Sequence, residues 1–342
     1  MADALLVLDD VARTFDVSPP WLDRVLTRQP RALLKAVAGV SFSIAPGETL
    51  GLVGESGCGK STIARVIVGL YAPTRGTVTF AGVDLDARGR PSPEQRAARR
   101  QMQMIFQDPY ASLNPRWRVE DIVAEPILAL APDIARSELK GRVAALLTQV
   151  GLAAADGSRY PHQFSGGQRQ RISIARALSS EPRFLVCDEP TSALDVSVQA
   201  QVLNLMRDLQ RRLRLTYLFI SHNLAVVHHI ADRVGVMYLG RIVELAPTHA
   251  LFGAPQHPYT RMLLAAVPDR GLTGVARTAV AGEVPNPLDP PPGCAFHPRC
   301  PYANERCRKE LPELLPAAGG GTVACHAVAE RRIDATPLVA RA

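Results

Sequence analysis

The segment GESGCGKS, at Gly54–Ser61, decides the fold because it fits the phosphate-binding pattern G-x-x-x-x-G-K-[ST]. The stretch TLGLVG that leads into it predicts a buried strand, and STIARVIVGL after it predicts a helix. Glycines let the backbone wrap closely around phosphate oxygens, and the first turn of the helix directs its amides at the same anion. A strand, this loop and a helix in succession therefore predict a site for nucleotide phosphates.

The polar side chains of this loop have separate expected roles. Lys60 supplies positive charge to the β- and γ-phosphates, Ser61 is a ligand for Mg²⁺, and Thr62 reaches the α-phosphate. We interpret Cys58, at a variable position of the pattern, as a tolerated small residue. An ordinary glycine turn that caps a helix would not need Lys-Ser at this place. The predicted nucleotide contacts are Gly54, Glu55, Ser56, Gly57, Cys58, Gly59, Lys60, Ser61 and Thr62.

A second apolar strand, FLVCDE, ends in the carboxylates Asp188 and Glu189. Alone, such a pattern is common where a strand ends in a charged turn. Together with the phosphate-binding loop, Asp188 is placed to bind Mg²⁺, directly or through water. Glu189 is placed to polarise an attacking water as a general base. The two motifs together predict the hydrolysis of ATP with Mg²⁺.

Strands and helices alternate outward from these motifs, which predicts an α/β fold with a parallel sheet. LLVLDDVARTF predicts a strand near the N-terminus, and the polar, proline-bearing segment Asp16–Leu34 predicts a loop. A hairpin is expected at Gly76–Val83, a basic helix at 94–101, and mostly helical structure from about Asn114 to Gly151.

Composition and charge limit the function classes. The chain has 342 residues and a net charge of +7, and we interpret the arginine-rich stretches Arg96–Arg100 and Arg207–Arg214 as solvated helix faces, not as a nucleic-acid surface. No run of residues reaches transmembrane length, and MADALLVLDD does not resemble a signal peptide. We expect a cytoplasmic protein that is soluble or held to a membrane only through a partner.

After about Leu251 proline becomes frequent, and Val284–Pro298 predicts a linker to a small C-terminal module. A small module with so few apolar residues needs a covalent or metal cross-link to be stable. A disulfide is not expected in the cytoplasm. Its four cysteines suit a structural zinc or a [4Fe–4S] cluster, and His297 and His326 leave a mixed zinc site open. The cysteines are Cys294, Cys300, Cys307 and Cys325, and they form no C-x-x-C pair.

Further motifs resemble those of the ABC ATPases, in family order, across roughly residues 1–250. FSGGQ resembles the signature sequence, with Ser165, Gly166, Gly167 and Gln168, and SALD, ending at Asp195, resembles the D-loop. Gln107 resembles the Q-loop glutamine, and His222 the switch histidine. The resemblance implies a P-loop ABC cassette with a RecA-like core, an antiparallel β subdomain and a helical subdomain at about 108–178. The ATPase domain is expected at 1–250 and the C-terminal module at 251–342.

The same resemblance implies roles for these residues. Gln107 is expected to reach Mg²⁺ and the attacking water, and His222 to contact the γ-phosphate and hold Glu189. The signature residues are expected to serve the ATP bound to a second ATPase subunit. Phe15 resembles the aromatic residue that stacks on adenine.

QDPYASLNPR, HPYTRMLLAAVP and GCAFHPRCPYANERC resemble the oligopeptide/dipeptide permease ATPases, with an F-type subunit favoured. That resemblance implies a heterodimer with a second ATPase subunit, two transmembrane permease subunits, an indirect link to a substrate-binding protein, and a peripheral place on the cytoplasmic face of the membrane. The resemblance also implies an iron–sulfur cluster in some members, ligated by cysteines at these positions, which ranks [4Fe–4S] first, zinc second and four unligated thiols third.

Three alternative functions use related sequence motifs. Importers of nickel, glutathione or other small solutes use similar ATPases. A non-transport ABC protein of DNA repair or translation would carry a long coiled coil or two cassettes, and neither pattern is present in the sequence. A metabolite kinase would have no use for a second phosphate-binding helix at the signature.

Overall fold

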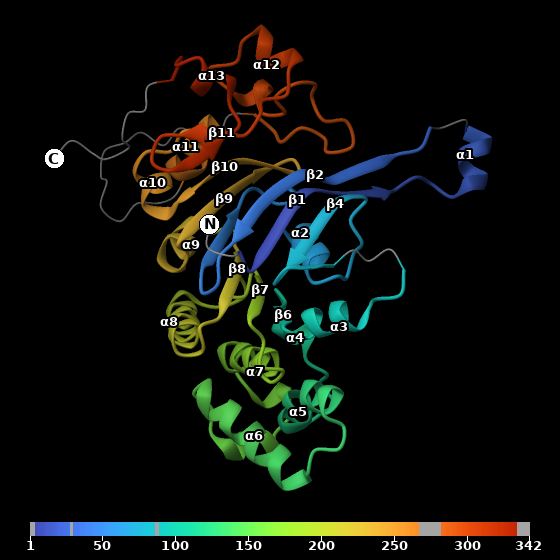
Figure 1. The fold of residues 1–342 in the computed structure, drawn as a ribbon, viewed down its shortest axis with the longest axis vertical. Coiled ribbons are helices and arrows are strands. Elements are labelled where there is room, and N and C mark those ends of the chain that lie inside the picture. The colour runs from blue at the N-terminus through green and yellow to red at the C-terminus, as the bar shows by residue number, and fades with distance from the viewer. Residues whose placement is uncertain (1–3, 28–29, 86–88, 267–281, 334–342) are drawn as a thin grey trace, which may run out of the picture.

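The computed structural model describes residues 4–27, 30–85, 89–266 and 282–333, and Figure 1 shows their arrangement. Two sheets organise the chain, one with eight strands and one with four. Within the described ranges, no helix is both long and apolar enough to cross a membrane.

The eight-stranded sheet carries the parallel strands that the alternating pattern predicts. Its order is β11-β12-β10-β9-β3-β8-β7-β6, and the five strands from β9 to β6 run parallel. Every residue of β3, β7 and β8 is buried, as expected for strands covered on both faces. These five strands are β3 (Thr49–Val53), β6 (Met102–Ile105), β7 (Phe184–Asp188), β8 (Thr216–Ile220) and β9 (Arg233–Tyr238).

A four-stranded antiparallel sheet in the order β2-β1-β4-β5 covers one side of the molecule. It packs with helix α2 (Lys60–Ile67) and one face of the large sheet in a shared apolar core. The hairpin expected at Gly76–Val83 is present as β4 and β5, which pair antiparallel. The strands are β1 (Leu6–Asp16), β2 (Leu33–Ile44), β4 (Arg75–Phe80) and β5 (Val83–Asp84).

The other face of the large sheet packs against helices in a second core, in which Leu185 and Phe219 meet the helical part of the chain. Figure 1 shows α5 and α6 farthest from the sheet, with α7 between them and the strands. The helices are α3 (Pro93–Arg100), α4 (Pro109–Ser112), α5 (Val119–Leu130), α6 (Arg136–Gln149), α7 (Gly166–Leu178), α8 (Val196–Leu213) and α9 (Leu224–Ile230), with 3₁₀ turns at Ala154–Ser158 and Pro161–Gln163.

The segment predicted as a loop at Asp16–Leu34 contains a short helix, α1 (Trp21–Thr27), so that prediction was wrong in part. Pro20 fixes the backbone just before the helix, and Asp23 places a negative charge in its first turn, which favours a helix start. In Figure 1 the long β1–β2 hairpin carries α1 away from the body of the molecule.

The C-terminal part of the chain extends the large sheet. Strand β12 (Gly321–Val323) pairs antiparallel with β10 (Arg241–Pro247), with Val323 opposite Glu244, and β11 (Leu315–Ala317) follows at the edge. The remaining elements are α10 (Thr248–Gly253), α11 (Pro258–Ala265), a 3₁₀ turn at His297–Arg299, α12 (Glu305–Lys309) and α13 (His326–Ala329).

Candidate functional site

Four loops of the predicted site lie at one edge of the large sheet. The phosphate-binding loop follows β3, His222 follows β8, Glu189 follows β7 and Gln107 follows β6. These strands are neighbours in the order β3-β8-β7-β6 and run parallel. Their carboxyl ends therefore meet, where open α/β sheets place their ligands.

The phosphate-binding loop closes around the ammonium group of Lys60. Its Nζ donates to the carbonyl oxygens of Gly54 at 2.8 Å and Glu55 at 2.9 Å, and the side chain is only 5% exposed. Lys60 also begins α2, so its charge adds to the positive end of that helix. The loop thus gathers a buried cation and helix amides at one place, which is what a triphosphate requires.

Two glycines of the loop are needed for space as well as for backbone conformation. Gly54 has φ +151°, and a Cβ there would lie 2.2 Å from the carbonyl oxygen of Met237. Gly59 has φ +104°, and a Cβ there would lie 2.2 Å from the carbonyl oxygen of Ala36. Both distances are far inside van der Waals contact. Any larger residue would move the loop away from β2 and β9.

Ser61 and Asp188 present oxygen atoms side by side. The Ser61 hydroxyl donates to Asp188 Oδ1 at 2.9 Å, and Asp188 is 4% exposed. Burial raises the pKa of the Asp188 carboxyl, and the hydrogen bond from Ser61 opposes that rise. A hydroxyl beside a buried carboxylate fits Mg²⁺, which prefers oxygen ligands and would add to the positive charge that Lys60 and Arg65 bring to Asp188.

Glu189 is held at both carboxylate oxygens by residues from the neighbouring loops. Oε2 accepts a hydrogen bond of 2.9 Å from Gln107 Nε2, and Oε1 lies 3.2 Å from His222 Nδ1. The backbone of Glu189 has φ +48°, an uncommon conformation for a residue with a side chain, and its N–H donates to the Ile220 carbonyl. Such fixed carboxylates suit a general base.

The sequence comparisons agree with this geometry. The ABC transporter family profile matches residues 37–192, and the profile of the oligopeptide/dipeptide transporter C-terminal region matches residues 243–307. The di/tripeptide transport ATP-binding protein DppF of Pseudomonas aeruginosa is 50% identical over 325 residues, which cover 95% of this chain and 98% of that protein. This chain belongs to the ATP-binding proteins of the oligopeptide/dipeptide ABC transporter family.

Other relatives of this ABC ATPase give the same result. The oligopeptide transport ATP-binding protein OppF of Escherichia coli K12 is 53% identical over 289 residues, covering 84% of this chain and 86% of that protein. A solved dimer of the ATP-binding cassette MJ0796 with ADP and phosphate has a TM-score of 0.60 and 25% identity, and covers 71% of this chain and 98% of its own. The predicted family and the ABC cassette fold are confirmed.

The signature residues of this ABC ATPase form the start of α7. Ser165 and Gln168 cap the helix reciprocally: the Ser165 hydroxyl accepts from the Gln168 N–H, and the Gln168 side chain accepts from the Ser165 N–H. A Cβ at Gly167 would lie 2.3 Å from Val198, so glycine permits close packing on α8. None of these residues hydrogen bonds to the phosphate-binding loop in the part of the chain that the structure describes. They are positioned independently of this chain's own phosphate-binding loop.

Asp195, Phe15 and Thr62 have less defined surroundings. Asp195 is exposed and directly precedes α8, without capping it through its side chain. The Phe15 ring packs edge-on against Tyr71, with centroids 5.3 Å apart, and the Arg13 guanidinium lies 4.6 Å from the Phe15 centroid. Thr62 lies in the first turn of α2 and is partly buried. Stacking of Phe15 on adenine stays a prediction.

The four C-terminal cysteines come close together. The Cys294 N–H donates to the Cys307 carbonyl at 2.8 Å. Burial raises the pKa of Cys294 to about 12 and that of Cys300 to about 11, and the charges of neighbouring cysteines, Cys325 among them, add to both shifts. However, the described residues contain no group of three or more His, Cys, Asp or Glu side chains arranged to hold a metal ion. The predicted cluster therefore has no support from the side-chain geometry.

The two histidines that left a mixed zinc site open each hydrogen bond to a main-chain carbonyl through one ring nitrogen. His297 Nδ1 lies 3.0 Å from the Cys294 carbonyl oxygen, and His326 Nε2 lies 3.0 Å from the Glu310 carbonyl oxygen. Each of these ring nitrogens must carry a proton to make its hydrogen bond, which leaves the other nitrogen of each ring unprotonated and able to ligate zinc.

Two residues that reach the phosphate-binding loop from the C-terminal part of the chain were not predicted from the sequence. Arg299 forms an ion pair with Glu55, and the Tyr259 hydroxyl accepts a hydrogen bond from the Glu55 N–H at 2.9 Å. One signal was available, because Glu55 is an acidic residue in a loop that binds anions. A carboxylate in that loop is expected to pair with a cation, although no sequence pattern near Glu55 shows which one.

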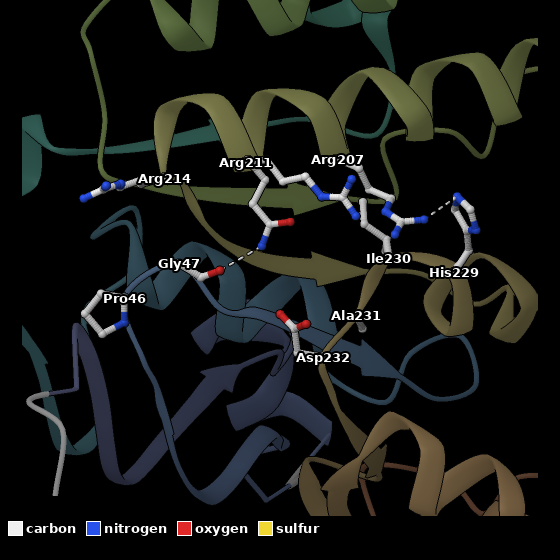
Figure 2. A pocket seen from close by; sticks show the side chains of 10 residues that line it. Pro46, Gly47, Arg207, Arg211, Arg214, His229, Ile230, Ala231 and Asp232 are labelled. Atoms are coloured by element: carbon white, nitrogen blue, oxygen red, sulfur yellow. Dashed lines mark hydrogen bonds between the residues drawn. The ribbon is translucent and has the colours of Figure 1, made fainter.

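A basic hollow of about 540 Å³ lies away from this site, beside the turn that precedes β3 (Figure 2). Its lining includes Arg207, Arg211 and Arg214 of the α8 end, with His229 of α9 and Asp232. Figure 2 shows Arg214 extending away from His229, so the cationic groups do not converge on one point. This surface agrees with the solvated helix face expected for 207–214.

Proposed function

We propose that this chain is the ATP-hydrolysing subunit of a membrane importer for dipeptides and oligopeptides. The match of residues 243–307 to the C-terminal region of oligopeptide/dipeptide transporters carries the proposal. The ATP motifs alone are common to ABC ATPases of many functions, whereas the profile that matches this region is that of oligopeptide/dipeptide transporters. Relatives named for di/tripeptide and oligopeptide transport align over most of the chain.

In the proposed reaction, Lys60 and the amides at the start of α2 bind the triphosphate. Ser61 and Asp188 would hold Mg²⁺, with Gln107 in reach of it, and the bound ion would neutralise phosphate charge. Glu189 orients the water and takes its proton as the water oxygen bonds to the γ-phosphorus and the bridging oxygen leaves with ADP. His222 holds Glu189 and contacts the γ-phosphate.

The proposed assembly contains a second ATPase subunit, so that the signature at Ser165–Gln168 closes on the nucleotide of the partner. Because no hydrogen bond joins the described signature residues to this chain's own phosphate-binding loop, a second chain is the expected user of the amides at the start of α7. Two permease subunits and, indirectly, a substrate-binding protein complete the importer. The chain then lies peripherally on the cytoplasmic face of the membrane and has no nucleic-acid partner.

For the C-terminal cysteines we keep the [4Fe–4S] cluster as a proposal with zinc as its alternative. The proximity of Cys294, Cys300, Cys307 and Cys325 supports it, whereas their arrangement does not meet the geometry of a metal site. Protein purified without oxygen should be brown and carry iron and sulfide that are lost when Cys300 becomes serine. A colourless protein with one equivalent of zinc would replace the cluster by zinc, and a metal-free protein would exclude both.

The transport proposal is tested with the whole importer in lipid vesicles. We expect ATP-dependent uptake of a labelled tripeptide, abolished by Glu189→Gln in this chain. Uptake of nickel without peptide would assign the importer to another solute. ATP hydrolysis without uptake of peptide, nickel or glutathione would contradict an import function.

A further inference from the structure

The C-terminal part of the chain is bound to the phosphate-binding loop by an ion pair. Arg299 Nη1 donates to Glu55 Oε2 at 2.8 Å, and Nη2 donates to Glu55 Oε1 at 3.0 Å. The Arg299 side chain is 2% exposed and that of Glu55 is 23% exposed. Two parallel charge-assisted hydrogen bonds in a largely buried place are strong and direction-specific.

Aromatic residues pack around the Arg299 guanidinium, and one of them also binds the main chain of Glu55. The guanidinium lies 5.8 Å from the ring of Phe296 and 5.9 Å from that of Tyr238. Tyr259 is fully buried, packs against both rings, and accepts the Glu55 N–H at its hydroxyl. Side chain and main chain of Glu55 are therefore both fixed by residues at least 204 positions later in the chain.

A second contact joins the same parts of the molecule. A small cavity of about 70 Å³ is lined by Glu55–Cys58 on one side and by Val284 and Pro287 on the other. The proline-rich stretch predicted as a linker thus lies against the phosphate-binding loop.

We propose that Arg299 is a positioning residue that couples the C-terminal segment 282–333 to ATP binding. It acts in two ways through Glu55. It fixes the backbone path from Gly54 to Cys58, next to the amides that receive the phosphates. It also neutralises a carboxylate that would otherwise repel the triphosphate. The coupling is independent of which solute the importer carries.

The test measures the MgATP dissociation constant of the full chain and its variants. Arg299→Ala should weaken binding by about tenfold or more, the loss expected for charge-assisted hydrogen bonds. Arg299→Lys keeps a charge but loses the paired geometry, and should fall between Arg299→Ala and the parent. Arg299→Ala combined with Glu55→Gln should recover part of the affinity, because the unpaired negative charge is gone. A general loss of stability would not produce this recovery.

The matched control is Arg306→Ala. Arg306 lies in the same segment and pairs with Glu310 and Glu330, away from the phosphate-binding loop. It should leave MgATP affinity unchanged, with melting temperatures recorded for all variants. If Arg299→Ala does not fold, Arg299→Lys and Glu55→Gln still decide the question. Affinities within twofold of the parent for every Arg299 variant that folds, equal losses in the control, or no recovery in the double variant would each overturn the proposal.

Discussion

Gln107 and Glu189 are joined by a hydrogen bond of 2.9 Å, although they lie 82 positions apart in the sequence. The bond exists because β6 and β7 are adjacent parallel strands, which bring the residues after their carboxyl ends together. Through this bond the amide nitrogen of Gln107 donates to the carboxylate of the proposed base. Because the amide nitrogen is the donor, the amide oxygen is left for the proposed Mg²⁺, and the hydrogen bond links the Gln107 loop to the position of the base.

Glu189→Gln should bind MgATP with unchanged affinity and hydrolyse it about 10² to 10⁴ times more slowly in the assembled importer, because the amide cannot take a proton from water. Phosphate release and nucleotide titration measure the two quantities. Glu181→Gln is the control, since Glu181 is an exposed carboxylate paired with Arg142. Turnover near the parent rate in Glu189→Gln would mean that another residue is the base.

Lys60→Ala and Ser165→Arg should separate the two halves of the proposed nucleotide sandwich. Lys60→Ala should lose nucleotide affinity in the isolated subunit, because the triphosphate then lacks its main point charge. Ser165→Arg should leave that affinity intact and reduce ATP hydrolysis by the complex, since Ser165 caps α7 apart from this chain's phosphate-binding loop. An equal loss of binding by the isolated subunit in both variants would contradict the sandwich.

The isolated subunit should hydrolyse ATP weakly, and its specific activity should rise with protein concentration. A complete site requires a second signature, which the isolated chain obtains only by pairing with another copy. Phosphate release across a dilution series, compared with that of the full importer, measures this. High activity that does not change on dilution would show that one chain contains the whole site.

His257 should make the folded protein sensitive to acid. Burial lowers its pKa to about 3, below the value of about 6.5 expected in the unfolded chain. The stabilisation by neutral His257 is complete above pH 6.5 and is lost as the pH falls towards 3, because the unfolded state binds the proton first. At pH 5 the loss is about 2 kcal/mol.

His257→Asn should reduce the fall in melting temperature between pH 7.5 and pH 5. Asparagine does not titrate and can replace the ring nitrogen that accepts the Tyr259 N–H at the start of α11. His249→Asn, at an exposed position, should leave the pH dependence as in the parent. An unchanged pH dependence in His257→Asn would assign the acid sensitivity to other groups.

Local sequence patterns are sufficient to predict the motifs of this protein and the type of its central sheet. The glycines around Lys60 and the apolar strand before Asp188 identify a phosphate site and a carboxylate pair, because each motif contains within a few residues the groups that its chemistry needs. The alternation of strands and helices along the chain also predicts a parallel sheet, because each strand and helix is indicated by its own local pattern of apolar residues. Helix α1 was missed because seven residues after two prolines carry too little periodicity to indicate a helix.

Contacts between segments that are distant in the sequence are seen only in the folded chain. The pairing of Arg299 with Glu55 spans 244 positions, and the pairing of Val323 with Glu244 adds the C-terminal strands to the sheet. No local sequence pattern predicts either contact. An arginine before a cysteine and a glutamate in a loop, for example, each have many potential partners in the chain. Strand order and packing select one partner among them. The shape of the ATP site therefore depends on residues that no motif of that site contains.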